Sequence, residues 1–97
     1  MIESFGNQLA EDLFFDRTTR ETRRLPADLR RAARRKLLYL HEAAGLDDLR
    51  VPPGNRLELL KGDRRGFHSV RINDRRRVVF RWVDGRARNV SVEDYHR

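Results

Sequence analysis

The chain has 97 residues, of which 38% are hydrophobic and 38% charged, and its formal net charge is +7 at pH 7. A chain of this length predicts one small domain over residues 1–97 with a modest core. It contains no cysteine, which excludes a disulfide framework and thiolate chemistry. No apolar run approaches the roughly 18 residues of a membrane span, and the start of the chain lacks the regions of a signal peptide. The expected location is the cytoplasm, without a membrane partner.

The positive charge is concentrated in the C-terminal part of the chain. Residues 1–55 carry ten Lys and Arg against nine Asp and Glu, whereas residues 56–97 carry twelve against six. Twenty of the 22 basic residues are Arg, whose planar fork suits phosphate and also stacks on bases. An arginine-rich genome would explain the preference for Arg over Lys, but not the asymmetry. The charge therefore predicts a polyanionic partner, with RNA or DNA first.

The N-terminal half predicts a short strand and two helices. Residues 1–5 are expected to form the strand. Residues 7–16 predict a short helix, and residues 17–25 a basic connector. The apolar stripe of the short helix consists of Leu9, Leu13 and Phe14.

The second helix has a regular apolar pattern. Pro26 suits a first helical turn, Asp28 suits the positive end of the helix dipole, and Gly45 is a plausible stop. The predicted core-facing stripe, at three- and four-residue spacing, is Leu29, Ala33, Leu37, Leu40 and Ala44. The opposite face carries Arg30, Arg31, Arg34, Arg35 and Lys36. This basic face is either simply solvated or a docking surface for an acidic or nucleic-acid partner.

The C-terminal half predicts a loop followed by four strands. Residues 46–56 form the loop, because two prolines force extended backbone and Gly54 with Asn55 allows a tight turn. Strands at hairpin spacing follow at residues 57–60, 67–72, 75–82 and 86–95. Asp84 and Gly85 mark a tight hairpin. The order β-α-α-β-β-β-β predicts an α+β domain with two N-terminal helices packed on a small, mainly antiparallel sheet.

Alternation within the strand at 75–82 separates two faces. Val78, Phe80 and Trp82 share one face, and Arg77, Val79 and Arg81 share the other. We expect Trp82 to be a core residue rather than a platform for a base.

Candidate catalytic residues gather at the end of the last predicted strand. Asp94, Tyr95 and His96 can exchange protons, and a strand holds such side chains better than a loose tail does. Cleavage of RNA through its 2′-hydroxyl needs a base, an acid and a cation for the charge on phosphorus. His96 titrates in the useful range, Arg77 can hold phosphate oxygens, and Lys61 could stabilise developing charge.

Each candidate also has a structural interpretation. His96 could simply be exposed, Tyr95 could cap the core, and Lys61 could be solvated in its turn. Arg77 could pair with a carboxylate such as Glu58 or Glu93. The three histidines are far apart in the sequence and show no ligand spacing, so neither a metal nor another cofactor is predicted.

Five segments in a fixed order resemble the HigB toxins of the RelE/ParE superfamily. They are Pro52–Glu58, Leu60–Arg64 with Gly66, Ser69–Asp74, Arg77 with Phe80 and Trp82, and Asp94–His96. The opening Ile2–Phe5 is also similar to the start of that family. The resemblance therefore covers nearly the whole chain.

This resemblance implies a RelE-like fold and a type II toxin that is a ribosome-dependent endoribonuclease, cutting messenger RNA in the 30S A site and inhibiting translation. It implies catalytic roles for Lys61, Arg77, Asp94, Tyr95 and His96. The basic residues expected to contact messenger or ribosomal RNA are Arg56, Arg64, Arg65, Arg71, Arg75, Arg76 and Arg81. The implied partners are the ribosome, a neighbouring HigA-like helix-turn-helix antitoxin, and operator DNA bound by the toxin-antitoxin complex.

The chain departs from the family pattern at two positions. Some members carry a catalytic histidine where this chain has Glu58, which could accept a proton but would repel phosphate. The aromatic residue, usually Trp, that precedes the family arginine is Arg76 here. Two other functions stay open, namely a non-catalytic ParE-like toxin that targets DNA gyrase and a basic RNA- or ribosome-binding module. The retained catalytic set argues against the gyrase-targeting toxin.

Overall fold

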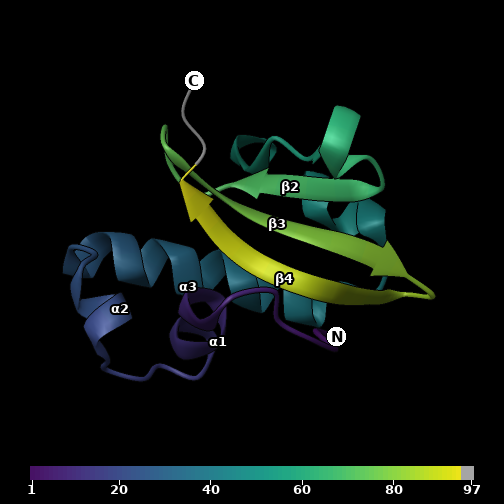
Figure 1. Cartoon of the computed structure of the whole chain (residues 1–97). Helices are drawn as coiled ribbons and strands as arrows, with labels where there is room; N and C mark the ends of the chain where they lie inside the picture. Colours follow the sequence, from purple (N-terminus) through teal and green to yellow (C-terminus); the bar gives the residue numbers. More distant parts are fainter. Residues whose placement is uncertain (95–97) are drawn as a thin grey trace.

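A computed structural model of the chain describes residues 1–94. It confirms the predicted α+β class, with helices beside a four-stranded antiparallel sheet in the order β1-β2-β3-β4 (Figure 1). The described helices are α1 (Gln8–Phe14), α2 (Arg20–Arg23) and α3 (Ala27–Glu42). The strands are β1 (Glu58–Leu59), β2 (Phe67–Arg71), β3 (Arg76–Val83) and β4 (Arg86–Asp94). None of the helices in residues 1–94 is long and apolar enough to cross a membrane.

The long helix α3 supplies one wall of the core. Its fully buried side chains, Ala33, Leu37 and Leu40, are those that the spacing predicts. The helix ends at Glu42, earlier than expected, so the prediction of Ala44 as a stripe residue is wrong. Ala44 is exposed, and Ala43 turns inward in its place.

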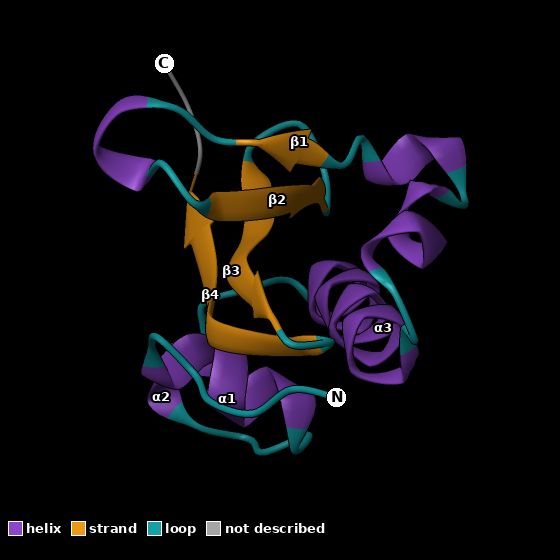
Figure 2. Cartoon of the chain, turned by 90° about the vertical axis from the view of Figure 1, so that its right-hand side faces the viewer, coloured by secondary structure: helices purple, strands orange, loops and turns teal. Residues whose placement is uncertain are grey.

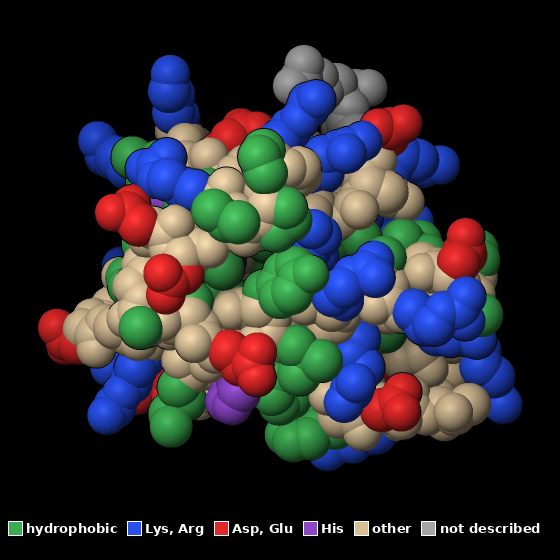
Figure 3. Space-filling view, turned by 180° about the vertical axis from the view of Figure 1, so that it is seen from behind, with side chains coloured by type: hydrophobic (Ala, Val, Ile, Leu, Met, Phe, Trp, Pro, Cys, Tyr) green, Lys and Arg blue, Asp and Glu red, His purple; other side chains and the backbone are tan. Residues whose placement is uncertain are grey.

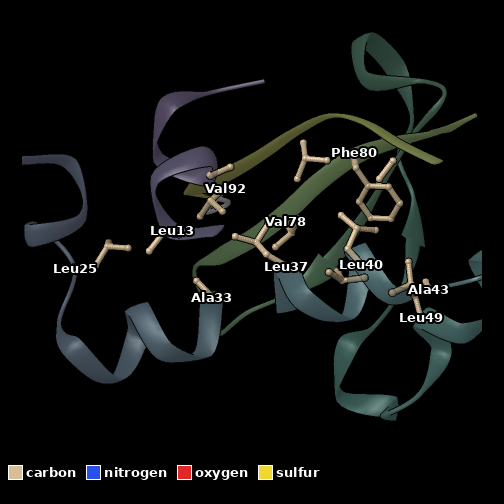
Figure 4. Packing of buried hydrophobic residues seen from close by; sticks show 14 residues of the cluster. Leu13, Leu25, Ala33, Leu37, Leu40, Ala43, Leu49, Val78, Phe80 and Val92 are labelled. Carbon is tan, nitrogen blue, oxygen red and sulfur yellow. The ribbon is translucent and has the colours of Figure 1, made fainter. Parts of the chain in front are cut away.

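The core lies between α3, α1 and one face of the sheet. Leu37 and Leu40 of α3 lie close to Val78 and Phe80 of β3 (Figure 4). Each fully buried Leu or Val side chain contributes about 1.5–3 kcal/mol relative to an exposed one. In Figure 2, α3 lies along one side of the sheet, and α1 lies beside β4. This packing leaves the other face of the sheet for a site.

The N-terminal segment lines the edge of β4 without forming a full strand. The predicted strand at residues 1–5 is reduced to two isolated parallel bridges, which join Ile2 to Ala87 and Phe5 to Val90. The next residue but one, Asn7, caps α1 by accepting a 3.0 Å hydrogen bond from the Ala10 amide. The chain therefore turns into the helix too soon for a longer strand to pair.

The predicted connector at residues 17–25 contains the one-turn helix α2. Thr19 and Thr22 cap it reciprocally, each side chain bonding to the other residue's backbone amide. The hydroxyl of Thr19 also donates a 3.0 Å hydrogen bond to the buried carboxylate of Asp12. Local capping thus adds a helix that apolar periodicity cannot reveal.

The predicted loop at 46–56 is also more regular than expected. It contains two short 3-10 helices, η1 (Leu46–Arg50) and η2 (Pro53–Asn55). A third, η3 (Gly62–Arg64), occupies the predicted turn between β1 and β2.

The register of the sheet separates an inner face from an outer face. Val78 lies opposite Val70 and Val92, and these side chains join the core. The outer face, directed away from the core, carries Phe67, Ser69, Arg71, Arg77, Val79, Arg81, Ser91 and Glu93. The predicted alternation of β3 is confirmed, as is its hairpin, since Asp84 and Gly85 have φ angles of 52° and 77°.

Candidate functional site

Arg77 is a nearly buried cation on the outer face of the sheet, with only 7% of its surface exposed. Its Nε donates a 2.7 Å hydrogen bond to the hydroxyl of Ser69 on β2. Its Nη2 donates a 2.7 Å hydrogen bond to the backbone carbonyl of Arg56. These two bonds fix the plane of the guanidinium, so the predicted phosphate-binding residue is held rigidly before any ligand arrives.

The loop before β1 directs the Arg56 carbonyl toward Arg77. Arg56 follows η2 with φ 46°, in the left-handed region. The preceding residue, Asn55, is 1% exposed, and its amide donates to the Leu49 carbonyl at 3.1 Å. The amide oxygen of Asn55 accepts a 2.5 Å hydrogen bond from Lys36 of α3. The loop is therefore anchored to the helix.

Lys36 has an environment that disfavours its charge. Burial lowers the pKa of the Lys36 ammonium, and the nearby charges of Arg35 and Arg71 lower it further. Sequence reasoning missed Lys36 and Asn55 as supports of the site. A signal was present for Asn55, because an Asn in a Pro-Gly turn often bonds to nearby backbone.

Within residues 1–94, Glu58 is a carboxylate that pairs with Arg77. Its Oε1 lies 3.4 Å from Nη2 of Arg77, and its side chain is 52% exposed. β1 places Glu58 opposite Ser69, which brings it to the same part of the sheet. The long distance and the exposure make this a weak ion pair. An incoming anion could therefore displace the Glu58 carboxylate.

The other carboxylate considered for Arg77, Glu93, pairs instead with Arg64 of η3. Two parallel hydrogen bonds of 2.9 and 2.7 Å join the guanidinium to the two carboxylate oxygens. The Ser91 hydroxyl adds a 2.6 Å hydrogen bond to Glu93. These hydrogen bonds, that from Arg64 foremost, lower the pKa of the Glu93 carboxyl. Arg64 is thus held over the outer face of the sheet. Because Glu93 lies directly opposite Arg77 in the sheet, Arg64 lies beside Arg77.

Of the catalytic residues predicted at the end of β4, the structure describes only Asp94. Asp94 accepts a 3.1 Å hydrogen bond from Arg75, and its position in β4 lies opposite Arg76. Alternation along β4 directs Asp94 and Glu93 to opposite faces. The predicted catalytic residues Tyr95 and His96 lie outside the described residues.

Lys61 begins the turn that carries Arg64. It is exposed, at the N-terminal end of η3. Within residues 1–94 its ammonium has no hydrogen-bond or ion-pair partner. The structure therefore brings together Arg77, Glu58 and the Arg56 backbone, while Lys61 remains available to solvent.

The remaining predicted RNA contacts are spread around this cluster. Arg71 pairs with Asp74, and the guanidinium of Arg81 lies over the ring of Phe67. Arg65 is exposed and Arg76 half-buried. The back of the molecule is also rich in Lys and Arg, with acidic side chains set singly among them (Figure 3). The arginines around Arg77 and the basic side chains on the back of the molecule both fit a polyanionic partner.

The described residues offer no metal centre. Within residues 1–94 no group of three or more His, Cys, Asp or Glu side chains could hold an ion. His41 accepts a 3.1 Å hydrogen bond from the Ile2 amide. His68 is stacked on Phe80, with ring centroids 5.9 Å apart. Both histidines thus make contacts that stabilise the fold.

Comparison with known families matches residues 3–96 to the HigB-like toxins, described as the RelE-like toxin of type II toxin-antitoxin system HigB. The chain is 37% identical over 95 residues to Toxin HigB-1 of Vibrio cholerae serotype O1, which covers 98% of both chains. It is also 39% identical over 41 residues to Endoribonuclease HigB of Proteus vulgaris, covering 42% of this chain and 45% of that protein.

A solved structure shares the fold. A chain of the YoeB-YefM complex from Staphylococcus aureus superposes with a TM-score of 0.59 at 19% identity. The match covers 100% of this chain and 99% of that one. At this level of identity the likeness supports the arrangement of helices and strands, and nothing finer.

Proposed function

The chain belongs to the HigB-like family of RelE-like toxins from type II toxin-antitoxin systems, and on that premise we propose that it is a ribosome-dependent endoribonuclease that cuts messenger RNA and stops translation. The name of the Proteus relative, an endoribonuclease, supports the reaction. The excess of Arg in the C-terminal half supports an RNA substrate.

The buried guanidinium of Arg77 carries this proposal. Burying a cation costs free energy unless hydrogen bonds and charges compensate it. Here the bonds to Ser69 and to the Arg56 carbonyl orient the group, while the facing Glu58 is exposed and 3.4 Å away. A fixed cation of this kind stabilises the extra negative charge on phosphorus without having to reorganise.

In the proposed reaction a base takes the proton of the 2′-hydroxyl, and the 2′-oxygen attacks the adjacent phosphorus. The bond from phosphorus to the 5′-oxygen breaks, and an acid protonates that oxygen, which leaves a 2′,3′-cyclic phosphate and a free 5′-hydroxyl. Arg77 holds the phosphate oxygens, and Lys61 contributes a second cation from its exposed turn. Tyr95 and His96 supply proton transfer and contact with the substrate, and Asp94, which alternation directs away from the face of Arg77, orients the His96 ring. Glu58, which lies beside Arg77, serves as an additional proton acceptor. We propose that Glu58 leaves Arg77 when the phosphate binds.

Dependence on the ribosome follows from how little of the substrate this site can hold by itself. A small domain with a few fixed cations does not force the RNA into an in-line geometry. A ribosome that holds the message in its A site supplies that positioning, which can account for much of a reaction barrier. The surrounding predicted RNA contacts then bind the message or ribosomal RNA: Arg56, Arg64, Arg65, Arg71, Arg75, Arg76 and Arg81.

The proposed partner that controls this activity is a HigA-like helix-turn-helix antitoxin. Membership of a toxin-antitoxin family supports such a partner. We expect the complex of the two proteins to bind operator DNA specifically, and the toxin alone not to do so. A mobility-shift assay with each protein alone and with the complex tests this arrangement.

Expression of the chain without an antitoxin tests the proposed function. We expect growth arrest and new 5′ ends within messages, detected by primer extension. Arg77→Ala and His96→Ala should both relieve the arrest. Arg20→Ala, which changes an exposed arginine of α2, is the matched control and should remain toxic.

Two results would overturn the proposal. Arrest without new 5′ ends would exclude message cleavage. Arrest with gyrase-linked DNA breaks would favour a ParE-like toxin instead.

A further inference from the structure

A polar pocket opens on the outer face beside the proposed catalytic residues. Its volume is about 250 Å³. Ser91 and Glu93 of β4 lie at its base, and Arg64 and Phe67 line one side. Asn89 lines the other side, together with the N-terminal segment. Nothing in the proposed cleavage reaction uses this pocket.

A bulge in β4 creates the pocket. The pairing register between β3 and β4 shifts between Val79 and Arg81, and Asn89 adopts a φ of 54° in the left-handed region. The extra residue bends the strand. Gly6 packs against the bend so closely that a Cβ there would lie 2.8 Å from the Asn89 carbonyl oxygen. The close approach of Gly6 to the Asn89 backbone thus fixes the course of the chain along this wall.

The opposite side is a stack of planar groups. The guanidinium carbons of Arg64 and Arg81 lie 5.3 and 5.5 Å from the centre of the Phe67 ring. The two hydrogen bonds to Glu93 hold the plane of Arg64 in place. Aromatic rings and arginine planes are the surfaces on which proteins stack unpaired bases. This side therefore offers a preformed stacking surface.

The pocket lies next to the proposed phosphate-binding residue. Glu93, at the base, is directly opposite Arg77 in the sheet. Arg77 has a second cross-strand neighbour, Arg71 of β2. Phe67 lies four residues before Arg71, a separation of about 13 Å along the strand. Arg77 reaches back over part of that distance to Ser69. A nucleotide beside the phosphate on Arg77 is therefore within reach.

We propose that this pocket binds one unpaired nucleobase of the RNA substrate, stacked on the Arg64-Phe67 surface. The base edge faces the amide of Asn89 and the hydroxyl of Ser91, which offer both donors and acceptors. The proposal rests on the proposed function and specifies which part of the substrate this region holds. Phe67 and Asn89 are substrate-binding residues in this account, without a role in proton transfer.

A fluorescent base tests the proposal directly. Short single-stranded RNA carrying 2-aminopurine should bind the purified toxin with quenched fluorescence, because the base stacks. Phe67→Leu should weaken binding about ten-fold and abolish most of the quenching, as expected for loss of one stacked base. Phe67→Tyr keeps the ring and should restore both. Thermal unfolding of each variant checks that the fold is retained.

An abasic substrate provides the matched control. RNA lacking the base at the quenched position should bind wild-type protein as weakly as intact RNA binds Phe67→Leu. The two losses should not add, since both remove one contact. Additive losses, or unchanged binding by Phe67→Leu, would overturn the base pocket.

Failure of the pocket and failure of the proposed function give different results. If wild-type toxin cuts messages on ribosomes but quenches no labelled RNA, the pocket is wrong and the endoribonuclease assignment stands. If wild-type toxin cuts nothing on ribosomes, the assignment fails. Wild-type quenching that Phe67→Leu leaves unchanged would place the base elsewhere.

Discussion

The Nη2 group of Arg77 donates a 2.7 Å hydrogen bond to the backbone carbonyl of Arg56, which lies 21 residues earlier in the chain. This bond ties the proposed phosphate-binding cation to the loop before β1. Because Arg56 adopts a left-handed φ of 46°, its carbonyl can point toward the sheet. The position of the cation thus depends on loop backbone as well as on β3.

Arg77→Lys should abolish cleavage while keeping the fold. A lysine retains the charge but cannot reproduce the fork that bonds Ser69 and the Arg56 carbonyl. Leaving buried acceptors unpaired should cost about 1–3 kcal/mol of stability. Urea unfolding together with ribosome-dependent cleavage measures both effects. Cleavage at the wild-type rate would show that charge alone suffices.

Asn55→Ala should reduce cleavage without touching substrate. The buried Asn55 amide joins Lys36 of α3 to the Leu49 carbonyl, so its loss frees the loop that carries the Arg56 carbonyl. We expect a destabilisation of about 1–3 kcal/mol and a lower rate constant on saturating programmed ribosomes. The matched control is Val51→Ala, an exposed change in the same loop. A variant as unstable as expected but fully active would make Asn55 purely structural.

Gly6→Ala should destabilise the fold and distort the pocket. The new Cβ would meet the backbone oxygen of Asn89 at 2.8 Å, so the N-terminal segment has to shift. Overpacking of this kind costs about 1–3 kcal/mol. Gly54→Ala is the control, since its Cβ would meet nothing within 4 Å. Equal melting temperatures for the two variants would contradict the close approach.

His68 should make stability depend on pH. Burial lowers the pKa of its imidazole below the ordinary 6.5, and the charge of Arg50 lowers it further. The Nδ1 atom is buried without a hydrogen-bond partner among the described residues. The unfolded chain therefore takes up the proton first. The stability from neutral His68 is fully present above pH 6.5 and is lost as the pH falls toward the folded pKa.

Unfolding at pH values above and below 6.5 checks this sign. The wild-type free energy of unfolding should decrease on the acidic side, by at most about 1.4 kcal/mol per pH unit for one proton. His68→Phe keeps a ring against Phe80 and should flatten that part of the profile. Parallel profiles for the two proteins would assign the pH dependence to other groups.

Much of the fold was predictable because local patterns agree with tertiary packing. The apolar spacing of Ala33, Leu37 and Leu40 reports the face of α3 that the sheet covers. The pair Asp84-Gly85 accepts the positive φ angles of its turn. The short helix α2 was missed because its signal is the capping pair Thr19 and Thr22 rather than periodicity.

The site was predictable in its residue types but not in its pairings. Alternation placed Arg77 on the outer face, yet its burial depends on a backbone carbonyl from a distant loop. The choice between Glu58 and Glu93 could not be made from strand spacing. η3 decides it by bringing Arg64 over Glu93, which leaves Glu58 to Arg77. Such contacts between separate turns have no periodic signal in a sequence.

Incubation of the purified toxin with a defined message tests the central claim most directly. New 5′ ends should appear by primer extension when programmed ribosomes are present, and should be absent without ribosomes or with Arg77→Lys. No cleavage by wild-type toxin on translating ribosomes, or equal cleavage by Arg77→Lys, would contradict the account.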